Sequence, residues 1–251
     1  MEPTIYLASS VRLQFVGPKG GFIMGMEWYD AIAKKNGGYK SNAIYSVEGL
    51  SGEDVFEERL IKMLGDYDSV LDAGCGHGEF TIRMAKYAKN IIGFDNSREL
   101  LTIARSLLEE SHAQNVQFVY ALTKGENPLP FEDGQFDLIY DRRGPTSIID
   151  HGRILRSGGV IFGIHSAAME KVQERLHNNG FIHIEIDEFN EAIMVFSNAT
   201  EFTKALSAIP GNPDYSLSEY AAELQKKINE SKINGRLAIK QWRYIWRAVK
   251  P

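Results

Sequence analysis

Short apolar runs alternate with amphipathic helical segments through the middle of this chain. The runs lie in the segments SVLDAG, NIIGFD, VQFVY, FDLIY and GGVIFGI. A segment between two of them, SRELLTIARSLLEESH, has apolar residues at helical spacing behind a Ser97 cap. Strands buried on both faces read as such runs, and their alternation with helices is typical of a parallel sheet covered on both sides. The sequence therefore predicts an α/β fold with a doubly wound sheet.

Composition excludes several classes of protein. The formal net charge of -5 over 251 residues gives no general attraction to nucleic acid, so RNA binding would need a local basic patch. The single cysteine, Cys75, excludes an internal disulfide framework and a multi-cysteine zinc site, which fits a reducing cytoplasm. No apolar run approaches the roughly 20 residues that span a bilayer. We expect a cytoplasmic protein without a metal and without a membrane partner.

A turn of alternating glycines follows the first apolar run. In VLDAGCGHGEF, Gly74, Gly76 and Gly78 remove side chains where a ligand binds in an open parallel sheet. Dinucleotide sites prefer the order G-x-G-x-x-G, whereas here position 79 is Glu, and its carboxylate would repel a pyrophosphate. Asp95, at the end of the second run, is placed to accept hydrogen bonds from both hydroxyls of a ribose. The pattern indicates a nucleoside ligand without a diphosphate, such as S-adenosylmethionine.

The chain divides into segments of different pattern. We expect residues 24–251 to form a single domain behind a segment of distinct character, residues 1–23. Within the domain we predict N-terminal helices over 24–65, the core sheet over 66–196, a helical insertion or cap over 197–235 and a final strand over 236–251. Trp28, Tyr29, Tyr39 and Tyr45 precede the sheet and would either fold over the site as a lid or pack as simple core, as aromatic residues in N-terminal helices do more often.

Residues 1–23 lack the pattern of a secretory signal. One hypothesis is that they are an untranslated leader read as protein, because Lys19-Gly20-Gly21 can be encoded by a purine-rich ribosome-binding sequence just upstream of Met24. The start would then be Met24 or Met26. The alternative is a disordered or strand-like N-terminal arm. The intact mass of the native protein distinguishes the two.

Four segments resemble a known family. VLDAGCGHGEF, IIGFDNS, LPFEDGQFDLIY and ILRSGGVIFGIH are similar, in order and spacing, to successive motifs of class I S-adenosylmethionine-dependent methyltransferases. The similarity is to the subgroup of quinone-biosynthesis and ribosomal-RNA guanine methyltransferases, and it covers about Val70 to His165. It implies a Rossmann-like sheet of seven mostly parallel strands whose last strand is antiparallel, with an N-terminal helical lid and a helical insertion before that strand.

The resemblance also implies the cofactor contacts. Asp72, Gly74, Gly76 and His77 would line the methionine part of S-adenosylmethionine, and Asp95 and Asn96 would line the ribose and adenine edge. Further cofactor contacts are predicted for neighbouring turn and strand-end residues: Cys75, Gly78, Leu122, Thr123 and Tyr140. One departure is that Ala121, Leu122 and Thr123 stand where relatives carry an acid for the adenine amino group. Thr123 or a backbone carbonyl would have to replace that acid.

The methyl acceptor should lie beyond the fourth and fifth strands, at YDRRGPTS and GIHS. Arg142 and Arg143 favour a carboxylate or phosphate on the acceptor, unless they are solvated loop residues or pair with Asp141 or Asp150. His165 is placed to take a proton, unless it caps or packs beneath the next helix. We therefore predict a catalytic set of Arg142, Arg143 and His165.

The sequence predicts an S-adenosylmethionine-dependent methyltransferase, an enzyme that releases S-adenosylhomocysteine and acts on a small or carboxylate-bearing acceptor. One alternative is an RNA base methyltransferase, and another is a protein that binds S-adenosylmethionine without catalysis. Exposed arginines and an exposed His165 on opposite sides of the site would favour the last. A nicotinamide dehydrogenase is disfavoured by Glu79. The sequence does not indicate an oligomeric state.

Overall fold

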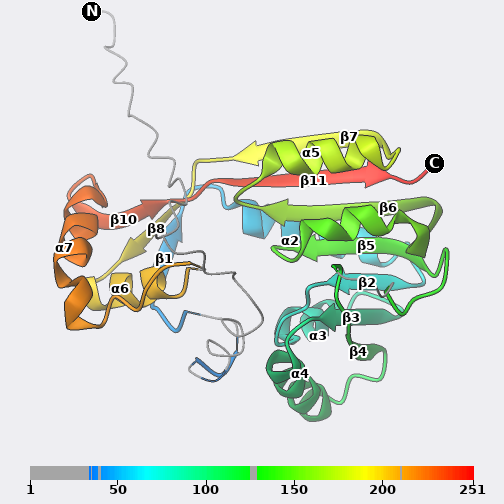
Figure 1. The fold of residues 1–251 in the computed structure, drawn as a ribbon, viewed down its shortest axis with the longest axis horizontal. Helices are drawn as coiled ribbons and strands as arrows, with labels where there is room; N and C mark the ends of the chain where they lie inside the picture. Colours follow the sequence, from blue (N-terminus) through cyan, green and yellow to red (C-terminus); the bar gives the residue numbers. More distant parts are fainter. Residues whose placement is uncertain (1–33, 35, 39–40, 125–128, 210) are drawn as a thin grey trace, which may run out of the picture.

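The computed structural model describes residues 34, 36–38, 41–124, 129–209 and 211–251 (Figure 1). The expectations for residues 1–23, and for a lid containing Trp28, Tyr29 and Tyr39, lie outside the described residues.

A seven-stranded sheet forms the larger part of the molecule. Its strands are, in chain order, β2 (Val70–Ala73), β3 (Ile91–Asp95), β4 (Val116–Tyr120), β5 (Phe136–Arg142), β6 (Leu155–His165), β7 (Ile182–Phe189) and β11 (Arg243–Val249). Their spatial order is β4-β3-β2-β5-β6-β11-β7. The first five pair in parallel, and β11 lies antiparallel to both of its neighbours. The predicted fold, including its antiparallel last strand, is confirmed.

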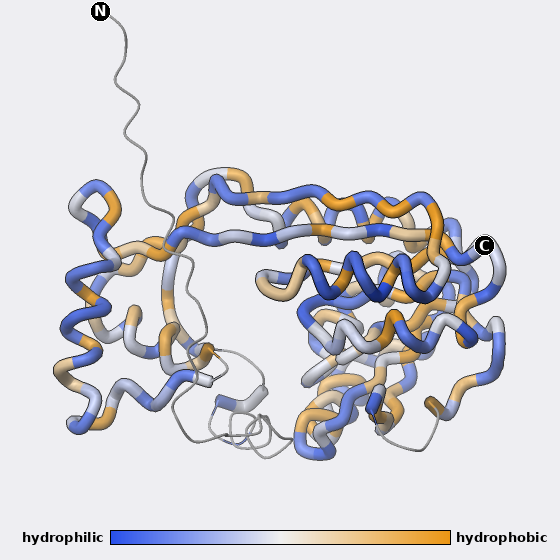
Figure 2. Tube along the Cα trace, turned by 45° about the horizontal axis from the view of Figure 1, so that its top comes forward, coloured by the Kyte–Doolittle hydropathy of each residue, from blue (hydrophilic) through white to orange (hydrophobic). Residues whose placement is uncertain are grey.

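Helices cover the main sheet on both faces (Figure 1). One face carries α2 (Gly52–Leu64), α3 (Glu79–Met84) and α4 (Arg98–Ser111), and the other carries the 3-10 segment η1 (Thr146–Ile154) and α5 (Met169–Asn178). Each face has its own buried cluster, with Phe56 of α2 stacked on Phe162 on one side and Leu176 of α5 packed with Trp246 on the other. Hydrophilic residues colour much of the outer helix turns (Figure 2). The inner strands β2, β3 and β5 are mostly buried, as the apolar runs predicted, whereas the edge strand β7 is mostly exposed.

A second, smaller sheet lies beside the main one (Figure 1). Its order is β1-β8-β10-β9, and its strands are β1 (Tyr45–Glu48), β8 (Ile193–Phe196), β9 (Lys232–Ile233) and β10 (Arg236–Lys240). Helices α6 (Ala199–Ser207) and α7 (Ala221–Glu230), with the 3-10 turn η2 (Ser218–Tyr220), pack with it. The N-terminal helices predicted over 24–65 include α2, but Tyr45–Glu48 is a strand, because these residues pair antiparallel with β8, a partner about 150 residues away that no local pattern reveals.

The predicted final strand over 236–251 is two strands. β10 pairs with β8 in the small sheet, whereas β11 pairs with β6 and β7 in the main sheet. The N–H of Gln241, between them, donates to the carbonyl of Ala192 over 2.8 Å, between β7 and β8. The chain segments that pair as β7 and β11 in the main sheet therefore pair again, beyond this break, as β8 and β10 in the small sheet. The small sheet is thus a continuation of the β7 edge of the main sheet.

In the part of the chain that the structure describes, no helix is both long and apolar enough to cross a membrane.

Candidate functional site

The glycine turn between β2 and α3 adopts a backbone that side chains would obstruct. Gly74 and Gly76 have φ values of +82° and +57°, in the left-handed region that glycine tolerates best. A Cβ on Gly74 would lie 2.6 Å from Cδ of Pro145 and 2.8 Å from Cα of Gly144. The turn thus lies directly against the loop after β5, and two strand ends meet at one place as the switch in strand order requires.

Asp95 is fixed beside this turn by backbone donors. Its Oδ2 accepts from the N–H of Gly76 over 2.9 Å, and its Oδ1 accepts from the N–H of Ser97 over 2.9 Å. The residue is 8 % exposed. Because one carboxylate oxygen is anchored on each side, the plane of the carboxylate is set by the two loops, and its position at the end of β3 is the one predicted for a ribose contact.

Asp72 lies beneath the turn rather than on its surface. Its Oδ2 accepts from the hydroxyl of Thr81 in α3 over 2.6 Å. Burial raises the pKa of Asp72 to about 7, while the Thr81 hydroxyl, Tyr140 and Arg142 oppose the rise. Tyr140 is fully buried on the same face of the sheet. Asp72 and Tyr140 therefore support the turn from below.

Cys75 and His77 complete the turn. Burial raises the pKa of the Cys75 thiol well above its ordinary value, so the thiol is not an activated nucleophile. Nε2 of His77 lies 3.2 Å from Oε2 of Glu79 in the first turn of α3. Cys75 is buried, so its side chain is part of the packing beneath the turn.

Thr123, the predicted substitute for the adenine-contacting acid, makes two contacts. Its Oγ1 lies 2.6 Å from the Oγ of Ser147, and its carbonyl lies 3.0 Å from Nε2 of His151. Both partners come from η1, so the loop after β4 is tied to the segment after β5. Leu122 beside it is exposed, and Asn96 is partly buried next to Asp95. Ser147 and His151 were missed because nothing in their local sequence marks them.

Arg142 and Arg143 converge on a glutamate that the sequence did not single out. Arg142 Nη2 lies 3.0 Å from Oε2 of Glu53, and Arg143 Nε lies 3.5 Å from Oε1. Nε of Arg243, at the start of β11, also donates to Oε1 of Glu53 over 3.1 Å. Burial raises the pKa of Glu53, but the three guanidinium groups outweigh it and hold that pKa below its ordinary value.

His165 is buried, and both of its ring nitrogens are engaged. The indole N–H of Trp246 donates to Nδ1 over 3.0 Å, and Nε2 lies 3.3 Å from the carbonyl oxygen of Gly144. An indole nitrogen can only donate, so this network assigns the ring proton to Nε2. Burial lowers the pKa of His165 and Asp141 raises it, with the net direction upward, whereas the bond from Trp246 favours the neutral ring.

The predicted catalytic residues do not form one group. Side chains alternate along a strand, so Arg142 shares the α2 face of the sheet with Tyr140, while Asp141 and His165 lie on the face that carries Trp246. The structure therefore brings Arg142 and Arg143 together with Glu53 and places His165, which is 7 % exposed, on the other face from Arg142. Glu53 is still close enough to His165 to contribute to the rise of its pKa.

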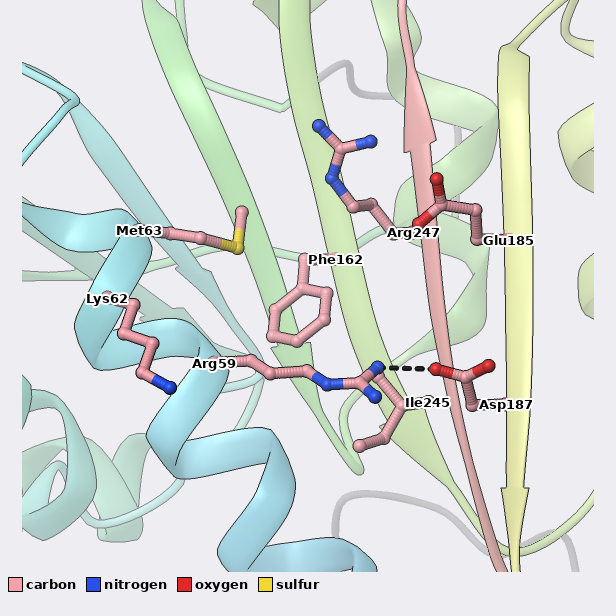
Figure 3. Close-up of a pocket in the computed structure, with 8 residues that line it drawn as sticks. All are labelled: Arg59, Lys62, Met63, Phe162, Glu185, Asp187, Ile245 and Arg247. Carbon is pink, nitrogen blue, oxygen red and sulfur yellow. Dashed lines mark hydrogen bonds and ion pairs between the residues drawn. The ribbon is translucent and has the colours of Figure 1, made fainter.

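A cavity of about 420 Å³ lies between α2 and the strands β6, β11 and β7. Figure 3 shows Arg59 reaching across it to Asp187, with Phe162 and Ile245 as an apolar floor. Among the residues that the structure describes, no group of three or more His, Cys, Asp or Glu side chains is arranged to hold a metal ion.

Comparison with known proteins agrees with this architecture. The family described as "Methyltransferase domain" matches residues 64–233, more than half of the chain. Demethylmenaquinone methyltransferase of Lactococcus lactis subsp. lactis is 30% identical over 140 residues, which are 51% of this chain and 53% of that protein. Malonyl-[acyl-carrier protein] O-methyltransferase of Hamiltonella defensa is 32% identical over 145 residues, again 51% of this chain and 53% of that protein. The chain thus spans about half the length of these curated relatives.

Among solved structures, a functionally unknown protein from Deinococcus radiodurans R1 superposes with a TM-score of 0.65. It is 23% identical, and the match covers 90% of this chain and 100% of that one. At this identity the likeness concerns the fold alone. The family itself is shown by the match over residues 64–233. The chain belongs to the class I S-adenosylmethionine-dependent methyltransferase family.

Proposed function

We propose that this protein is an enzyme that transfers the methyl group of S-adenosylmethionine to a small acceptor bearing a carboxylate. The observation that carries the proposal is Asp95, whose two oxygens are anchored by the N–H groups of Gly76 and Ser97 beside the bare glycine turn. Family membership supports the same reaction.

The chain's own residues fit this cofactor. Asp95 would accept from the ribose hydroxyls, because a carboxylate offers about four acceptor positions in its plane. The backbone of the turn from Gly74 to Gly78 would lie along the methionine part, and the loop at Leu122 and Thr123 along the adenine edge. When bound, S-adenosylmethionine supplies an electrophilic methyl group on a sulfonium. The protein's contribution is then to align the acceptor with that methyl and to exclude water.

For the acceptor, we propose that Arg142 and Arg143 bind its carboxylate. Their ion pairs with Glu53 support this role, since the same guanidinium groups already hold a carboxylate. The base role predicted for His165 stays a prediction. Its bonds to Trp246 and Gly144 favour a positioning role, in which it holds the loop after β5 against Gly74.

Thermal unfolding with and without S-adenosylhomocysteine tests cofactor binding. Ligand at 100 times its dissociation constant should stabilise the wild type by roughly 2.7 kcal/mol. Asp95→Ala should abolish the shift, and Asp95→Asn, which keeps the volume, should weaken binding at least about tenfold.

Asp137→Ala is the matched control. Asp137 also accepts from two backbone N–H groups, those of Asp68 and Ser69, but at the opposite end of the sheet. Its loss should lower stability and leave the S-adenosylhomocysteine shift intact. A wild-type protein whose melting temperature neither S-adenosylmethionine nor S-adenosylhomocysteine changes would refute the proposal.

Binding of S-adenosylmethionine without catalysis is the second candidate. The separation of Arg142 and His165 onto opposite faces favours it, although the burial of His165 does not. Incubation with methyl-labelled S-adenosylmethionine and a panel of small carboxylic acids separates the two, because a binding protein labels none of them.

The RNA alternative predicts binding that falls steeply with salt. The cytoplasm stays the proposed compartment, on the ground of the single cysteine.

A further inference from the structure

Three arginines surround one glutamate at the ends of β5 and β11. We call Glu53, Arg142, Arg143 and Arg243 the Glu53 cluster. Two of its positive charges have no counterpart within it. Asp72 is within electrostatic range of Arg142, but its pKa of about 7 leaves it only partly charged at neutral pH. Asp141 points to the opposite face of the sheet.

Three of these four charges lie largely out of water, with exposed side-chain fractions of 16% for Glu53, 26% for Arg142 and 18% for Arg243. Arg143 is the exposed member of the cluster, at 41%. Burial and the neighbouring Arg143 lower the pKa of Arg142, because like charges crowd one another away from solvent. A buried excess of charge is costly unless something compensates it. The cluster therefore has the electrostatics of a site built for a second anion.

The carboxylate of Glu53 is only partly hydrogen-bonded by the arginines around it. Oε2 of Glu53 lies 3.0 Å from Arg142 Nη2, yet it is buried without a hydrogen bond of acceptable geometry among the described residues. Each arginine has five N–H donors and can grip a carboxylate with two at once. No arginine of the cluster makes such a paired contact in the described residues. A better-placed carboxylate can therefore compete with Glu53.

The position of the cluster suits an acceptor. The guanidinium of Arg142 lies 4.5 Å from the ring centroid of Phe80, which follows the glycine turn. Gly52 allows α2 to approach β11 closely, because a Cβ there would lie 2.9 Å from Cβ of Arg243. The cluster thus spans β5, β11 and the start of α2, on the far side of β5 from the turn on β2. That side is where the proposed function places the acceptor.

We propose that Arg142, Arg143 and Arg243 form the carboxylate site of the acceptor, and that Glu53 occupies this site until the acceptor displaces it. Arg243 is then a specificity residue that no motif marks. Glu53 holds the arginines together in the absence of ligand and competes with the acceptor's carboxylate. This inference rests on the proposed function for the identity of the bound carboxylate.

Malonate is the probe. The quantity measured is the malonate concentration that gives half of the maximal thermal stabilisation, with the ionic strength kept constant by chloride. Glu53→Gln keeps the shape and removes the competing charge, so it should lower that concentration about tenfold relative to wild type. Adding Arg243→Ala to it should abolish the response. In the wild-type background, Arg243→Lys keeps the positive charge but loses the paired N–H donors of the guanidinium, so it should raise the half-maximal malonate concentration about fivefold. This variant tests the site even if Glu53→Gln does not fold.

Asp187→Asn is the matched control. It removes the carboxylate of the other ion pair that ties α2 to the sheet, Arg59 with Asp187 (Figure 3). Its malonate response should equal that of wild type. An equal response in Glu53→Gln and Asp187→Asn, or an unchanged response in Arg243→Lys, would overturn the inference.

The cofactor's own carboxylate is the competing occupant. If Arg243→Ala weakens binding of S-adenosylhomocysteine but not of 5′-methylthioadenosine, which lacks the amino-acid part, the site belongs to the cofactor and the acceptor assignment is rejected. If S-adenosylhomocysteine binds normally and malonate does not respond to Glu53→Gln, the inference fails while the proposed function stands. A malonate response without any S-adenosylhomocysteine binding would reject the proposed function instead.

Discussion

Asp72 is the residue whose protonation should set part of the pH dependence of stability. Its pKa is raised by burial from 3.8 to about 7. The folded protein therefore holds this proton more tightly than the unfolded chain, so the free energy of unfolding should fall as pH rises from about 4 to about 7 and stay level above that. Asp72→Asn stays neutral and should remove this decline, which is on the order of 4 kcal/mol.

Urea unfolding at about pH 5 and about pH 8 covers about two thirds of this decline and compares it between wild type and Asp72→Asn. Asp137→Asn is the control, because the pKa of Asp137 is lowered and its contribution has the opposite sign, lost only as pH falls. If the free energy of unfolding of Asp72→Asn fell with pH as much as that of wild type, Asp72 would not be the source of the decline.

Gly163 makes room for the ring that holds His165. A Cβ at this position would lie 2.4 Å from Cε2 and Cζ2 of Trp246. Gly163→Ala should therefore cost about 1–3 kcal/mol through overpacking and disturb the bond from Trp246 to His165. Gly152→Ala, whose Cβ would meet Phe181 at an ordinary 3.6 Å, is the control and should cost much less. Urea unfolding followed by tryptophan fluorescence measures both, and equal losses would count against this account.

At the scale of elements, α4 depends on its cap. The N–H of Leu100 donates to Oγ of Ser97 over 3.1 Å, as the sequence predicted. Ser97→Ala should cost about 1 kcal/mol, because a helix donor loses its partner. Ser51 occupies the same position before α2 but makes no side-chain cap bond, so Ser51→Ala should cost less. Denaturant midpoints at constant slope report the difference, and a reversed order of the two losses would refute the role of the cap.

At the scale of the whole molecule, the two sheets should differ in local stability. All four residues of β2 are buried, whereas all four residues of β1 are exposed and α7 buries none of its residues. Segments with few buried contacts open first. Hydrogen exchange should therefore label β1 and α7 well before β2 and β5. Uniform protection across the two sheets would contradict this expectation.

The sequence pattern predicted the structure correctly where the residue types alone determine the backbone conformation. The run VLDA and the glycines after it require a buried strand and a side-chain-free turn, and the structure has both. The small sheet was not foreseen: the prediction placed Tyr45–Glu48 among N-terminal helices and Ile193–Phe196 in the core sheet, whereas the two segments pair with each other as β1 and β8. Burial of each strand depends on a partner that is distant in sequence, which local propensity does not contain.

The sequence by itself determined the doubly wound core, the glycine turn and the acid at the end of β3, because the period of apolar residues and the backbone freedom of glycine act locally. Only the tertiary structure decided that Glu53 and Arg243 join Arg142 and Arg143, and that His165 turns to the other face with Trp246. The reason is physical: which charges share a buried site depends on strand order and side-chain alternation across the whole sheet, and these exist only once the chain has folded.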